Sequence, residues 1–233
     1  MPDVSAKQPF VLPDFYVPWP ARLNPNREAA RLHAGEWARE MGMVRAREDG
    51  SGGEGAGLWD AARFDAMDFA LMAAYTHPDA PGPELELLTD WYAWSFYYDD
   101  YFHAAYKRTA DRRGGKECVD RLLMFMQLEP SSAAPEPTHP LERGLADLWA
   151  RTVPGKSAAW RLRFFRSTRQ FIDEAFRELS NISEQRVANP IEYIELRRRS
   201  GASDPWVTSL IEHASGIELP ERSTWKPCAS IIE

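Results

Sequence analysis

The sequence is poor in cysteine and in basic charge, and each shortage excludes a class of protein. Its two cysteines, Cys118 and Cys228, are far apart and in no CxxC spacing, which excludes a disulfide framework and a zinc knuckle. Lys and Arg number 28 against 35 Asp and Glu, for a net charge of −7. General nucleic-acid binders gain affinity mainly by neutralising phosphates, so nucleic acid is not an expected partner.

Long apolar runs are also missing. The most apolar stretch, Leu85–Tyr98, is interrupted by Glu86 and Asp90, and the first 20 residues lack the basic start and apolar core of a signal peptide. We therefore expect no membrane span and a cytoplasmic location. With 233 residues, of which 44% are hydrophobic, the chain can bury one sizeable core.

Proline and glycine divide the chain. Six of the 18 prolines lie within residues 1–25, which predicts an extended, aromatic-rich strap. Glycine-rich residues 48–57 and proline-rich residues 129–140 are predicted loops, both too short for domain linkers. We expect a single domain over residues 1–233, with a helical bundle at 26–222 and a divergent tail at 223–233.

Between these breaks the apolar residues recur with a period close to 3.6, and hairpin-like alternation is missing. Asp60 and Pro83 suit the starts of two helices. The fold class is therefore predicted to be all-α, with roughly seven helices. The candidates are Asn26–Met43, Ala61–Tyr75, Glu84–Lys107, Gly115–Met126, Pro140–Ala150, Ala158–Leu179 and Pro190–Ala214.

Two adjacent aspartates, Asp99 and Asp100, interrupt the aromatic stretch WYAWSFYYDDYFHAAYKR. Burying an unpaired carboxylate costs several kcal/mol, so a purely structural helix would avoid this pattern. Mg²⁺ would explain it, because this ion takes one or two carboxylates and completes its shell with water and phosphate oxygens. The alternative is that both aspartates point to solvent while the aromatic residues form the core.

The surrounding segments resemble a known family. Asp99–Phe102 within an aromatic helix is similar to the aspartate-rich motif of class I terpene synthases. Further segments resemble the amino-terminal cyclase domain of bacterial geosmin (germacradienol) synthases, and the similarity runs from about Pro9 to Arg222. These segments are FYVPWPARLNPN, WAREMGM, DFALMAAYTHPDAPGPELELLTDWY, LERGLADLWARTVP and RVANPIEYIELRR.

The resemblance implies a helical bundle around an apolar cavity, which binds farnesyl diphosphate through three Mg²⁺ ions. Asp99 would be the principal metal ligand, with Asp100 beside it. Phe96, one helical turn before Asp99, matches a cavity aromatic that binds substrate, although ordinary core packing stays open for it. Trp91, Tyr92 and Trp94 are expected in the core.

The motif departs from the family pattern DDHFLE, because Ala104 stands where the family has glutamate. That position is i+4 from Asp100, so its carboxylate would share a helix face with Asp100. Metal coordination is therefore expected to be weaker here. His103 is either a diphosphate contact or a packed residue, and a lone histidine on an aromatic helix favours packing.

A second landmark is the segment IEYIELRRRSGAS. By resemblance, Arg197 is the residue that senses diphosphate, Ser200 the linker and Gly201 the helix-break position. The alternative for the arginine run at 197–199 is a solvated basic stripe.

A third landmark is missing. The family's Asn-x-x-x-Ser-x-x-x-Glu metal triad should lie beyond Glu233, so we expect a truncated chain or a fragment, without the C-terminal helices and inactive or impaired alone. At most the aspartate-bound Mg²⁺ ions would then remain. Phe171, Phe176, Tyr193 and Trp206 would be poorly covered.

Three functions stay open. The first is a terpene cyclase that converts farnesyl diphosphate to a sesquiterpene. The second is a prenyltransferase, which is disfavoured because such enzymes carry two DDxxD motifs. The third is a non-catalytic helical remnant that binds a prenyl ligand or a partner chain. The product and the oligomeric state do not follow from the sequence.

Overall fold

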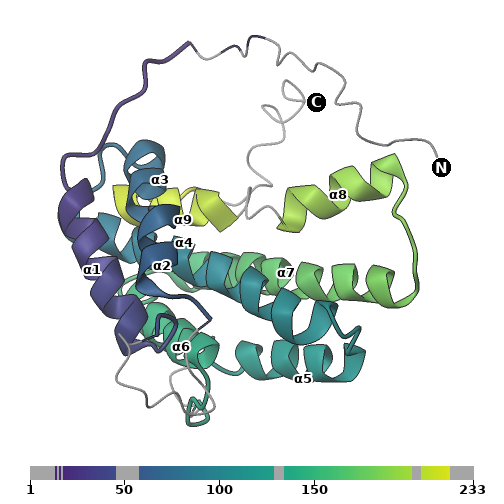
Figure 1. Ribbon diagram of the computed structural model, residues 1–233. Helices are drawn as coiled ribbons and strands as arrows, with labels where there is room; N and C mark the ends of the chain where they lie inside the picture. Colours follow the sequence, from purple (N-terminus) through teal and green to yellow (C-terminus); the bar gives the residue numbers. More distant parts are fainter. Residues whose placement is uncertain are drawn as a thin grey trace, which may run out of the picture.

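The computed structural model describes residues 14, 16, 18–45, 58–128, 134–200 and 206–220 (Figure 1). In this part of the chain every regular element is a helix, and one isolated bridge pairs Val44 with Trp59. The all-α prediction is therefore confirmed. The elements are α1 (Arg27–Glu40), α2 (Ala61–Met67), α3 (Phe69–Thr76), α4 (Gly82–Phe102), the π-helical turn η1 (His103–Lys107), α5 (Arg112–Leu123), α6 (Pro140–Thr152), α7 (Ala158–Ser183), α8 (Pro190–Ser200) and α9 (Trp206–Ser215).

Three helices that the sequence predicts as continuous are each divided. Ala61–Tyr75 is α2 and α3, because Asp68 adopts a left-handed φ of 43° and its carboxylate accepts a hydrogen bond from the Leu71 amide, which caps α3. Glu84–Lys107 is α4 followed by η1. Pro190–Ala214 comprises α8 and α9.

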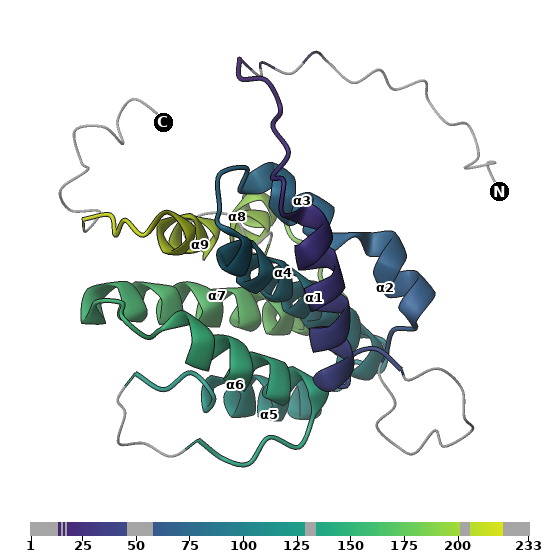
Figure 2. The ribbon, with the colours of Figure 1, turned by 90° about the vertical axis from the view of Figure 1, so that its left-hand side faces the viewer.

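Helix α4 forms the centre of the bundle. It packs against α1, α3, α6 and α9, and Figures 1 and 2 show these helices around it. Trp91 and Trp94 are fully buried on α4 and Tyr92 is nearly so, which confirms their predicted place in the core. Trp91 contacts Phe164 of α7 edge to face, with ring centroids 5.2 Å apart. Such aromatic pairs add to the stabilisation that burial provides.

A buried carboxylate ties α4 to two neighbouring helices. Asp90 is fully buried and accepts hydrogen bonds from His33 of α1 at 3.0 Å and Arg151 of α6 at 2.8 Å. Burial raises the pKa of Asp90, and its interactions with His33 and Arg151 oppose that shift. Asp90, which interrupts the most apolar stretch of the sequence, therefore connects α4 to α1 and α6 within the core.

Helix α9 covers part of the apolar surface that we expected to be exposed. Trp206 is buried against Phe171 of α7, with stacked rings 6.0 Å apart, and both are less than one-tenth exposed. The expectation of poor cover was wrong for these two residues. Phe176 is half-buried, whereas Tyr193 on α8 is 56% exposed, as expected.

Helix α6 approaches α4 closely at Gly144. A Cβ atom there would lie 2.9 Å from Cδ1 of Trp94 and would overlap the Met43 methyl group. We expect Gly144→Ala to lower the free energy of unfolding by about 1–2 kcal/mol, because overpacking outweighs alanine's better helix propensity. Urea unfolding would measure this loss.

Gly35→Ala on α1 is the matched control, since its Cβ would meet only the Arg39 side chain at an ordinary 3.6 Å. We expect that variant to be neutral or up to about 1 kcal/mol more stable. Equal losses for the two glycines would contradict the close approach at Gly144.

Folding stability should also depend on His77, which ends α3 and shares a hydrogen bond of 2.8 Å with the Tyr92 hydroxyl. Burial lowers the pKa of His77 to about 4 from 6.5. Above pH 6.5 the ring is neutral in both folded and unfolded chains. Between pH 6.5 and about 4 the unfolded chain binds a proton that the folded chain does not, so stability falls by roughly 3 kcal/mol in all.

The measurement is urea unfolding at several pH values for the wild type and for His77→Gln, which keeps a polar partner for Tyr92 but does not titrate. We expect the wild type to lose more stability than the variant between pH 7 and pH 4.5. Parallel pH profiles would exclude the role of His77.

No helix in the described parts of the chain is long and apolar enough to cross a membrane.

Candidate functional site

The aspartate pair lies near the C-terminal end of α4, where the two side chains have different surroundings. Asp100 is held in place: its Oδ2 accepts hydrogen bonds from Trp59 Nε1 at 2.8 Å and from Arg63 of α2 at 2.6 Å. Its side chain is 35% exposed. Asp100 therefore fixes α2 and the Trp59 segment against α4.

Asp99 is the accessible carboxylate. Its side chain is 67% exposed, and its one described ion pair is with Lys107 Nζ at 3.3 Å. The same ammonium donates a shorter hydrogen bond of 2.7 Å to Glu178 Oε2 of α7. Of the two aspartates, Asp99 is thus the one placed to bind a cation from solvent.

The π-helical turn η1 places Lys107 beside Asp99. Its hydrogen bonds run from residue i+5 to residue i, as in Arg108 N to His103 O at 3.1 Å. Each residue of a π turn advances by a smaller angle about the helix axis than a residue of an α-helix does. Lys107, the eighth residue after Asp99, is thereby brought back toward the helix face that carries Asp99. Ala104, at the position of the family glutamate, lies within this turn and is half-buried.

Phe96 lies one turn before Asp99 and is 48% exposed, with its ring 5.3 Å from that of Phe69 on α3. At positions i and i+3, Phe96 and Asp99 share one face of α4. His103 is exposed, so the expectation that it is packed was wrong. An exposed imidazole on this face is available to a ligand.

The second landmark lies on α8, which packs against α7. Arg197 is exposed on that helix, and α8 ends at Ser200. Gly201 and the Ser200 side chain lie outside the described residues. The neighbouring Arg199 approaches Glu174 of α7 to 3.7 Å.

Glu174 is a further buried acid that sequence reasoning missed. Its side chain is 3% exposed, its Oε2 has no hydrogen-bond partner among the described residues, and burial raises its pKa. It lines an open hollow of about 560 Å³ between α5, α7 and α8, together with Arg166, Arg169, Arg177 and Arg199. Cationic side chains therefore outnumber acids around the hollow. Arg166 and Arg169 are exposed, whereas Arg163 of α7 pairs with the buried Glu212 of α9 at 2.7 Å.

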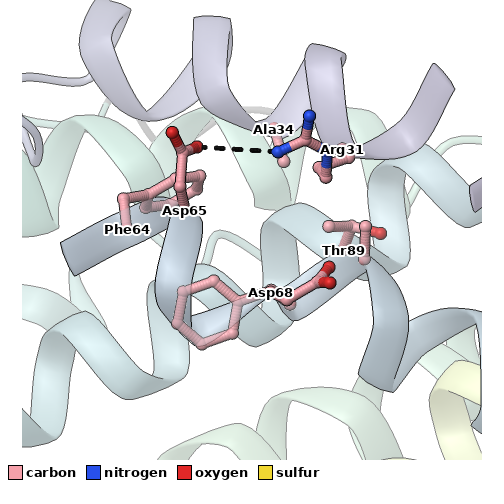
Figure 3. Close-up of a pocket in the computed structure, with 8 residues that line it drawn as sticks. Arg31, Ala34, Phe64, Asp65, Asp68 and Thr89 are labelled. Carbon is pink, nitrogen blue, oxygen red and sulfur yellow. Dashed lines mark ion pairs between the residues drawn. The ribbon is translucent and has the colours of Figure 1, made fainter. Parts of the chain in front are cut away.

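A small pocket between α1, α2 and α3 does not contribute to the site. Figure 3 shows Arg31 reaching toward Asp65, 4.0 Å away, above Phe64 and Asp68. Its volume of about 10 Å³ accommodates about one water molecule.

The donor set fits a weakly held Mg²⁺ ion. In the part of the chain that the structure describes, no three His, Cys, Asp or Glu side chains are grouped to hold a metal ion. Mg²⁺ does not require such a cage, because it keeps several waters and binds one or two carboxylates together with substrate phosphates. Asp99 meets that requirement, so diphosphate oxygens would have to complete the shell.

The aspartate motif does not predict four residues that lie in this region of the structure: Arg63, Lys107, Glu174 and Glu178. The i, i+4 spacing of Glu174 and Glu178 on one long amphipathic helix was a usable signal. Nothing in the sequence links Lys107 to Glu178, which lies 71 residues further along the chain.

The chain is similar to known terpene synthases, as its aspartate motif suggests. Pristinol synthase of Streptomyces pristinaespiralis is 32% identical over 210 residues, which cover 88% of this chain and 52% of that enzyme. A (−)-β-caryophyllene synthase of Saccharothrix espanaensis, named as cyclizing (2E,6E)-farnesyl diphosphate, is 30% identical over 89% of this chain and 54% of its own. The chain thus spans about half the length of these relatives.

Among solved structures, α-eudesmol synthase superposes with a TM-score of 0.72 at 25% identity, over 91% of this chain and 64% of that one. The bundle is therefore the class I terpene synthase fold. The family described as terpene synthase family 2, C-terminal metal binding, matches residues 90–233, which include Asp99 and Arg197 and make up more than half of the chain. On this match, the chain belongs to terpene synthase family 2.

Proposed function

We propose that this chain carries the aspartate-bound metal site of a bacterial sesquiterpene synthase that ionises and cyclises farnesyl diphosphate. The observation that carries the proposal is Asp99, an exposed carboxylate on a buried aromatic helix, beside the half-exposed ring of Phe96. The farnesyl substrate is supported by the (−)-β-caryophyllene synthase relative, which is named as cyclizing (2E,6E)-farnesyl diphosphate. The geosmin type, a single domain over residues 1–233 and a cytoplasmic location remain predictions from the sequence.

The residues divide the work as follows. Asp99 would bind Mg²⁺, which when present offsets the negative charge of the departing diphosphate. Arg197 would contact the diphosphate, with Ser200 as the linker and Gly201 as the helix-break residue further along the sequence. Phe96 would turn its ring face toward the prenyl chain, where aromatic rings stabilise a carbocation without attacking it, and the buried Phe69 would support that ring. Asp100 would support α2 rather than bind the substrate.

The chain spans about half the length of its relatives. The first test is therefore whether it binds farnesyl diphosphate, before turnover is measured. Calorimetric titration with farnesyl diphosphate should show binding that requires Mg²⁺. Analysis of volatile hydrocarbons should show impaired turnover by residues 1–233 alone. Binding that ignores Mg²⁺ would contradict the proposal and favour a prenyl-binding remnant. Longer prenyl diphosphates formed with isopentenyl diphosphate would favour a prenyltransferase.

A further inference from the structure

Lys107 is a buried lysine whose ammonium lies between two acids of the candidate metal site. Its side chain is 7% exposed, and its Nζ lies 2.7 Å from Glu178 Oε2 and 3.3 Å from Asp99 Oδ1. Lysine is almost never buried to this extent unless it is paired. The positive charge is therefore fixed beside the carboxylate that faces solvent.

We propose that Lys107 makes divalent-cation binding at Asp99 depend on diphosphate, because its ammonium offsets the Asp99 charge until a polyanion arrives. This inference rests on the proposed function of Asp99 as a metal ligand. Lys107 is a positioning and affinity-setting residue in this scheme, and it does not touch the substrate.

Geometry holds the ammonium in place. The shorter hydrogen bond of the ammonium is with Glu178, so α7 holds the lysine side chain. The ammonium also donates a longer hydrogen bond to Asp99. The π turn η1 ends at Lys107, which fixes its backbone relative to α4. Asp100 adds little free negative charge, since Arg63 and Trp59 already bond its Oδ2.

Coulomb repulsion gives the direction of the effect. A divalent cation on Asp99 would lie about 5 Å from Nζ, where repulsion by one unit charge lowers its affinity about tenfold even with the screening of bulk water. The orienting benefit of a single contact to an exposed carboxylate is smaller than this. Diphosphate brings several negative charges, which outweigh one ammonium.

The test is Mn²⁺ titration, followed by electron paramagnetic resonance, with and without inorganic diphosphate. We expect Lys107→Met to bind Mn²⁺ alone about tenfold more tightly than the wild type does, and the enhancement by diphosphate to shrink accordingly. Arg108→Met is the matched control, because it removes the same charge from the next residue, which is exposed. We expect it to change the affinity less than about twofold, since exposed charges are screened.

An unchanged or weaker Mn²⁺ affinity in folded Lys107→Met would overturn the inference, as would equal effects of the two variants. If Lys107→Met does not fold, Glu178→Gln decides, because it keeps the ammonium and removes its anchor. That variant should bind Mn²⁺ severalfold more weakly, and an unchanged affinity would again overturn the inference. Wild-type protein that binds no Mn²⁺ even with diphosphate would refute the proposed function as well.

Discussion

Asp99→Asn should lower the affinity for Mg²⁺ in the presence of diphosphate by about 100-fold, whereas Asp100→Asn should lower it by about tenfold or less. The two residues are neighbours of identical chemistry, so the difference tests the geometry alone. Asp99 is two-thirds exposed, with a single described ion pair, and Asp100 is bonded to Trp59 and Arg63. Calorimetry with Mg²⁺ and inorganic diphosphate would measure both affinities.

Stability should show the reverse order. Asp100→Asn weakens the contacts that hold α2 and Trp59 to α4, which should lower the free energy of unfolding by about 1 kcal/mol. Asp99→Asn loses one long contact to a mostly exposed carboxylate and should change stability by less. Equal losses of Mg²⁺ affinity in the two variants, or none, would contradict the assignment of Asp99 as the ligand.

The helical class of the fold and the aspartate pair could be predicted from the sequence because both depend on local patterns. The 3.6 period and the proline breaks located most helices. The break at Asp68 was missed because a single residue in a left-handed conformation, capping the next helix with its own carboxylate, leaves the apolar period unchanged. The π turn is similarly hidden, since it alters hydrogen bonding without interrupting the helix.

The surroundings of the site could not be predicted, because they depend on contacts between residues that are distant in the chain. Lys107 meets Glu178 across 71 residues, and Trp59 reaches Asp100 across 41. The motif identified a candidate ligand, and only the packing of α2 and α7 against α4 distinguishes Asp99 from Asp100. The exposure of His103 could not be predicted for the same reason, because it depends on whether residues distant in the chain pack against it.

Trp206→Ala should lower the free energy of unfolding by about 3–5 kcal/mol. Trp206 is 2% exposed, and its ring contacts those of Trp91, Tyr92 and Phe171 at 5.9, 6.2 and 6.0 Å. Its Nε1 has no described hydrogen-bond partner, so the loss comes from the cavity and the missing ring contacts. Urea unfolding followed by far-ultraviolet circular dichroism would measure it.

Ile211→Ala is the control on the same helix, because Ile211 is 48% exposed and its truncation should cost less than about 1 kcal/mol. A large loss for Trp206→Ala beside a small one for Ile211→Ala would establish that α9 closes the aromatic face between α4 and α7. A loss below about 1 kcal/mol for Trp206→Ala would mean that α9 does not hold this position in solution.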